Sequence, residues 1–294
     1  MAKGRMSVVR GTDRYITLAV DECDACGIKG IMFHCDDPQG IQYGSTLEMI
    51  LNMDRIFDSM SGPKQTFQMR HFPGTNPVDF ETRTSDEEVR KGKLSTFRIY
   101  VQYRYHASWQ GLIQWEEGER QELFESTLQL ILIMSRMLKG DFQAGQEGEA
   151  LSFFHVAIDS YDYGRIVGNY QSIPAVLTEQ YDVPADLAGT LGNFMEAKAL
   201  KEKYSAYGLN YGRLVSNEIC SICRKSGQKA TFTIKIMFCD HSTWQGIIHW
   251  REGRAEQTFR SFKEMLYLIV SVVGATTAGA ESYEDEVSTI ALGL

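Results

Sequence analysis

Two Cys-x-x-Cys pairs carry the clearest chemical signal in the chain, one at Cys23 and Cys26, the other at Cys220 and Cys223. Two thiolates on one turn can form half of a tetrahedral zinc site, so the two pairs together predict one structural zinc ion or none. The pairs lie far apart in the sequence, whereas zinc-binding pairs usually lie closer. A redox-active pair would begin a helix after a strand, which neither pair does. The remaining alternative is unpaired thiols in a reducing cytosol.

Two histidines, His106 and His241, precede identical Trp-Gln-Gly segments. A catalytic histidine needs an orienting carboxylate and a nucleophile or substrate beside it. Asp240 adjoins His241, but Tyr105 holds the equivalent place beside His106. We therefore interpret both histidines as polar residues of hairpin turns. Nothing else in the sequence assembles an acid, a base and a nucleophile, so we expect no catalytic residues and no enzyme.

The histidines belong to a segment that occurs twice, from Phe97 to Gly140 and from Phe232 to Gly274. In both copies apolar residues alternate as in two strands of a hairpin, and a short third strand follows. Ser126 and Ser261 then begin a helix as capping residues. Each copy thus predicts a β-β-β-α unit. The residues shared at constant offset are, in the first copy, Phe97, His106, Trp109, Gln110, Gly111, Trp115, Glu117, Gly118, Phe124 and Ser126.

Two diverged copies precede these segments. Gly30 lies as far before Ser45 as Gly111 lies before Ser126, and the surroundings of Gly168 match those of Gly30. We predict an α+β fold of four tandem β-β-β-α modules, called A, B, A′ and B′, each with an antiparallel sheet packed on its helix. The modules occupy residues 14–62, 95–140, 150–206 and 229–274, followed by a mobile tail over 275–294. Duplication of an A–B pair gives two pseudo-symmetric halves, residues 1–147 and 148–294.

The helices of modules B and B′ are apolar on nearly every side, which indicates that more than one surface covers each of them. We expect them to pack against one another inside the chain, with the sheets outward, in a monomer or weak homodimer. Trp109, Trp115, Trp244 and Trp250 alternate with polar residues along their strands, which favours a place in the core over an exposed stacking platform.

Composition places the chain among ordinary globular proteins. It has 294 residues, 43% of them hydrophobic, and a net charge of −8, which argues against general nucleic-acid binding. We see neither a membrane span nor the apolar core of a signal peptide, and we expect a cytoplasmic location without membrane contact.

The segment H-x-[ST]-W-Q-G-x-I-x-W, followed by F-x-S and an apolar helix, resembles a segment in short proteins of anaerobic Gram-positive bacteria to which no activity is assigned. The resemblance covers modules B and B′ alone. It implies a bacterial, cytoplasmic protein and nothing about chemistry.

We therefore expect a non-catalytic binding or scaffold protein that contacts a protein partner through sheet and helix faces. The alternative is a protein that handles nucleic acid through polar sheet faces, or an acidic inhibitor that imitates nucleic acid. The outward strand positions that would form the binding surface are Arg98, Gln102, Arg104, Gln110, Gln114, Lys235, Gln245 and His249.

Overall fold

The computed structural model describes residues 15–24, 27–34, 37–60, 63–79, 82–139, 153–172, 226–238 and 240–274. Residues 15–139 contribute β1 (Tyr15–Asp24), β2 (Gly27–His34), β3 (Asp37–Tyr43), α1 (Thr46–Ser59), β4 (Arg83–Ser85), β5 (Ser95–Tyr103), β6 (Gln110–Trp115), β7 (Arg120–Phe124) and α2 (Thr127–Lys139). Residues 153–274 contribute β8 (Phe153–Asp162), β9 (Arg165–Ser172), β10 (Ala230–Phe238), the short 3-10 helix η2 (Asp240–Ser242), β11 (Gln245–Trp250), β12 (Ala255–Phe259) and α6 (Phe262–Val273).

These strands form two antiparallel sheets. The first has seven strands in the order β4-β3-β2-β1-β5-β6-β7, and the second has five in the order β12-β11-β10-β8-β9. The α+β class is thus confirmed. The expectation of a separate sheet for each module is wrong, because β1 pairs with β5 and β8 pairs with β10. Three β-β-β-α successions lie within the described ranges, and the helix expected in module A′ lies outside them.

Four hairpins share one local irregularity. The pairing of β1 with β2, β5 with β6, β8 with β9, and β10 with β11 shifts register by one bulge. A glycine pairs with the last residue before each bulge: Gly30, Gly111, Gly168 and Gly246. A Cβ atom at these positions would lie about 2 Å from a carbonyl oxygen of the neighbouring strand. Close approach of two backbones therefore requires glycine there.

The predicted helix starts are confirmed. Ser45, Ser126 and Ser261 each accept a hydrogen bond, at 3.0 Å, from the backbone N–H three residues on. The side chains of Glu48, Gln129 and Glu264 in turn accept from the backbone N–H of the residue just before the capping serine. These bonds satisfy donors that a helix cannot satisfy internally.

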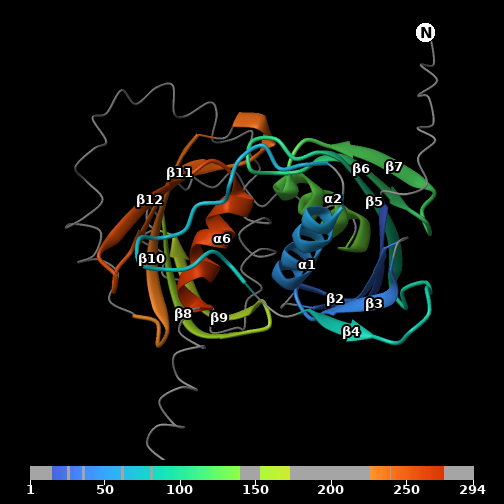
Figure 1. Ribbon diagram of the computed structural model, residues 1–294, viewed down its shortest axis with the longest axis horizontal. Coiled ribbons are helices and arrows are strands. Elements are labelled where there is room, and N and C mark those ends of the chain that lie inside the picture. The colour runs from blue at the N-terminus through green and yellow to red at the C-terminus, as the bar shows by residue number, and fades with distance from the viewer. Residues whose placement is uncertain are drawn as a thin grey trace, which may run out of the picture.

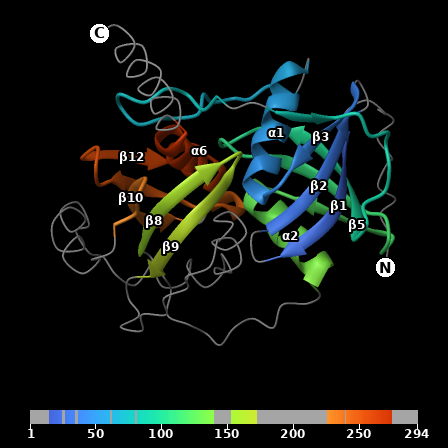
Figure 2. The ribbon, with the colours of Figure 1, turned by 90° about the horizontal axis from the view of Figure 1, so that it is seen from below.

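The helices lie between the two sheets (Figures 1 and 2). α1 and α2 cover the inner face of the first sheet, α6 covers that of the second, and α2 contacts α6. One continuous hydrophobic core joins residues of α1, α2 and α6 and of both sheets. Of the residues of α6, only Tyr267 is not fully buried. The expected contact of a partner with helix faces is therefore not available for α6, because the chain itself covers that helix.

Candidate functional site

A buried ionic cluster joins α1 to α6 around the carboxylate of Asp54. Its Oδ1 accepts from Arg104 at 2.9 Å, from the Trp109 indole at 2.8 Å and from Lys263 at 2.8 Å. Its Oδ2 accepts from Lys263 at 2.8 Å and from the Tyr267 hydroxyl at 2.6 Å. Lys263 and Tyr267 come from the far end of the chain, so this cluster links the two halves.

The electrostatics of this cluster follow from burial and from the paired charges. Burial alone raises the pKa of Asp54, but Lys263 and Arg104 outweigh it and hold that pKa below its usual range. Burial lowers the pKa of Lys263, and Asp54 partly opposes this effect. Arg104 also pairs with the exposed Asp58 at 2.6 Å, which balances the second cation. With both Asp54 oxygens occupied by donors, this carboxylate presents no free atom to a ligand.

The two halves meet a second time at the tips of two hairpins. His106 stacks on His241 with ring centroids 4.1 Å apart and planes 19° from parallel. The Ser261 hydroxyl donates to the Ala107 carbonyl at 2.6 Å, and the Ser126 hydroxyl donates to the Ser242 carbonyl at 2.5 Å. These two bonds are equivalent under the sequence repeat, so the contact is reciprocal.

Both hairpin tips adopt a strained backbone. His106, Ala107, His241 and Ser242 all have left-handed φ values between 53° and 55°. This conformation costs an L-residue roughly 1–2 kcal/mol. This backbone conformation directs the carbonyls of Ala107 and Ser242 toward the capping serines of the opposite half. The bonds to those serines give the strained conformation a structural reason. Ser45 makes the same kind of bond to the Gly164 carbonyl at 2.9 Å, from α1 to the turn between β8 and β9.

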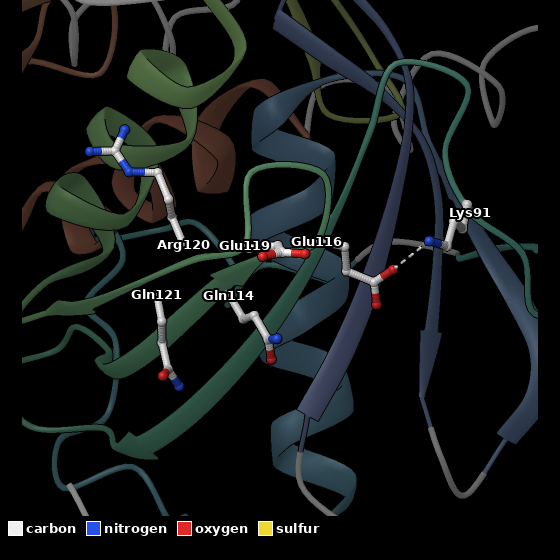
Figure 3. A pocket seen from close by; sticks show the side chains of 6 residues that line it. All are labelled: Lys91, Gln114, Glu116, Glu119, Arg120 and Gln121. Carbon is white, nitrogen blue, oxygen red and sulfur yellow. Dashed lines mark ion pairs between the residues drawn. The ribbon is translucent and has the colours of Figure 1, made fainter. Parts of the chain in front are cut away.

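The outer face of the first sheet presents a row of exposed polar residues. Arg98, Gln114 and Gln121 pair across β5, β6 and β7 and are all exposed. Next to this row Leu123 is 61% exposed. Figure 3 shows Gln114 and Gln121 side by side, pointing the same way.

A shallow depression of about 340 Å³ lies at the end of this row. Glu116 points across it to Lys91, 3.4 Å away, and also pairs with Arg98 at 2.7 Å (Figure 3). Lys91 and Arg98 thereby share one carboxylate as their counter-charge. The residues that line the depression are Lys91, Gln114, Glu116, Glu119, Arg120 and Gln121.

Strand alternation predicted that the candidate binding residues all lie on accessible sheet faces, but the structure places them in different environments. Arg98 and Gln114 are exposed, and Gln102 is exposed beside Tyr103. Gln110 and Gln245 are partly buried and bond the backbone of their own turns, and His249 is partly buried in β11. Arg104 and Lys235 are 1% and 3% exposed, so neither belongs to an accessible face. Bulges displace Arg104 inward, where Asp54 binds it.

The tryptophans follow the expectation of a core position. Trp109 and Trp244 are fully buried, while Trp115 and Trp250 are partly buried and pack against the core. The buried Trp109 and Trp244 therefore offer no open ring face for stacking.

The cysteine pairs fall mostly outside the described residues. Cys23 lies half-buried in β1, while Cys26, Cys220 and Cys223 belong to ranges that the structure does not describe. Within the ranges that it describes, no three His, Cys, Asp or Glu side chains gather as metal ligands. The zinc site stays a prediction.

Comparison with known proteins adds no relative. No family model, no curated protein and no solved structure matches this chain. No helix of the described ranges is long and apolar enough to cross a membrane.

Sequence reasoning missed the Asp54 cluster, although one signal pointed to it. Lys263 is the second residue of a helix that is otherwise apolar on nearly every side. A buried ammonium group requires a buried counter-charge. The sequence could therefore have prompted a search for a carboxylate on the other helices.

Proposed function

We propose that this chain is a non-catalytic binding protein that contacts a protein partner through the outer face of its first sheet. The observation that carries the proposal is the difference between the two sheets. Arg98, Gln114 and Leu123 stand exposed on the first sheet. The corresponding strand of the second sheet, β10, is buried on both faces from Ala230 to Ile236.

The charge on this face favours a protein partner over nucleic acid. Affinity for a phosphate backbone comes from cations without bound counter-charges. On the first sheet Arg98 and Lys91 both pair with Glu116, Arg104 is buried, and Arg120 is one further cation, exposed in the lining of the depression. A balanced polar surface with exposed leucine and glutamine instead resembles the mixed composition of protein interfaces. Nucleic-acid handling and imitation of nucleic acid remain outcomes that the experiment below would reveal.

We further propose that the scaffold of this surface is four β-β-β-α modules in two pseudo-symmetric halves. The shared bulge and glycine in four hairpins support this interpretation. Equivalent anchors support it too: Asp21 accepts from the Lys93 N–H at 3.0 Å, and Asp159 accepts from the Gln228 N–H at 3.1 Å. On this interpretation one half keeps β5 open on its outer face for binding, while the other half buries β10 on both faces.

Affinity capture from an extract of the encoding organism tests the proposal. The bait proteins are the wild-type chain, an Arg98→Glu/Leu123→Glu variant, and a Val89→Glu control. Val89 is 65% exposed and lies outside the strands, in the segment between β4 and β5. We expect the wild type and the control to capture one protein. After purification, that protein should bind both of them directly and should bind the double variant with lower affinity.

A labelled single-stranded and a labelled duplex oligonucleotide form the second arm of the same experiment. Binding that weakens steeply with added salt would show nucleic-acid recognition and overturn the proposal. Equal capture by all three baits would also overturn it, because the sheet face would then contribute nothing.

A further inference from the structure

The stacked histidines and the Ser–carbonyl bonds at the hairpin tips do not distinguish unlike halves from like halves. His106 and His241 are identical, and so are the capping serines Ser126 and Ser261. Two copies of the first half would form the same stack and the same reciprocal Ser–carbonyl bonds as one first half and one second half form. Pairing of unlike halves must therefore be specified elsewhere.

The Asp54 cluster is one place where the repeat is broken. Lys263 and Tyr267 of α6 correspond to Leu128 and Leu132 of α2 at the constant sequence offset of the repeat. Asp54 receives three hydrogen bonds from those two α6 residues. If a first half took the place of the second half, Asp54 would face two leucines, and a buried carboxylate would lose one of its two cations.

We propose that the Asp54–Lys263 pair specifies which halves pack together, and so directs the chain to fold on itself rather than to pair like halves from two chains. A buried charge left without its partner is strongly unfavourable, whereas a matched apolar replacement is tolerated. The preference for unlike halves depends on the interactions that a pairing of like halves would lose. The pair thus disfavours association of this chain with a second copy of itself.

Refolding of the full-length protein from denaturant, followed by light scattering, tests the proposal. We expect the wild type to return to one species with the mass of a single chain. An Asp54→Leu/Arg104→Met/Lys263→Leu variant removes the charges together, and we expect it to refold to a mixture of monomer and dimer. Should that variant prove insoluble, Asp54→Asn/Lys263→Gln, which keeps polar groups of similar size, applies the same test.

An Asp21→Asn/Arg90→Met variant is the matched control. Asp21 is partly buried and pairs with Arg90 at 2.7 Å, and both residues lie in the first half. We expect this control to lose stability and still refold to monomer. Refolding of the cluster variants to monomer alone would overturn the proposal, and so would dimer formation by the control or by the wild type.

Discussion

His106 and His241 stack face to face, 4.1 Å apart, although one belongs to each half of the chain. Asp240 adjoins this pair in sequence, and Glu125 lies nearby, because its carboxylate accepts from the Ser242 hydroxyl at 2.9 Å. The shielding of the ring by burial, together with repulsion from His241, lowers the pKa of His106 below its ordinary value.

This relationship predicts a pH dependence of stability. A histidine with a lowered folded-state pKa binds fewer protons than the same residue in the unfolded chain, so stability rises with pH through that interval. We expect the melting temperature to fall as pH drops below about 6.5, the ordinary pKa of histidine. The fall should be smaller in His106→Gln. NMR titration of the ring protons gives the direct measurement: in His241→Gln the pKa of His106 should move toward its ordinary value. An unchanged pKa would show that the stack is not responsible.

Asp54→Asn should be among the most destabilising single substitutions in the chain. It leaves Lys263 buried without its counter-charge, and breaking a buried ion pair costs roughly 3–5 kcal/mol. Urea denaturation measures the change. Glu22→Gln is the comparison, because Glu22 pairs with Lys29 at the surface, where such pairs contribute about 1 kcal/mol or less. Equal losses of unfolding free energy in Asp54→Asn and Glu22→Gln would contradict the importance of the Asp54 cluster for stability.

Ser261→Ala should cost about 1–2 kcal/mol, since it removes a helix cap. The hydroxyl also donates to the Ala107 carbonyl, so the loss should fall at the upper end of that range. Ser59→Ala serves as the control: its hydroxyl bonds only the Ile56 carbonyl in the last turn of α1. Thermal unfolding of the two variants should differ clearly, and a similar melting temperature would mean that the capping bond to the other half contributes little.

Gly111→Ala and Gly246→Ala should destabilise the protein by similar amounts, about 1–3 kcal/mol each, because an added methyl group forces two strands apart. Their Cβ atoms would stand 1.9 Å from the Tyr100 and Lys235 carbonyl oxygens. Gly44→Ala should be nearly neutral, since the nearest atom there, 3.1 Å away, is the end of the flexible Arg83 side chain. A large effect at one of the two strand glycines and none at the other would argue against equivalent hairpins.

The sequence by itself determined the local elements. Strand alternation, turn residues and Ser-x-x-Glu patterns act over a few residues, so the hairpins near Gly111 and Gly246 and the starts of α1, α2 and α6 were predictable. The core positions of the tryptophans were predictable for the same reason.

Only the tertiary structure decided which of these elements meet. The pairing of β1 with β5, which merges two modules into one sheet, depends on strand edges that look alike in sequence. A bulge after Val101 turned Arg104 from the predicted polar face into the interior. The bond from Lys263 to Asp54 joins distant parts of the chain. Such contacts depend on long-range packing and burial, which no local pattern of residues records.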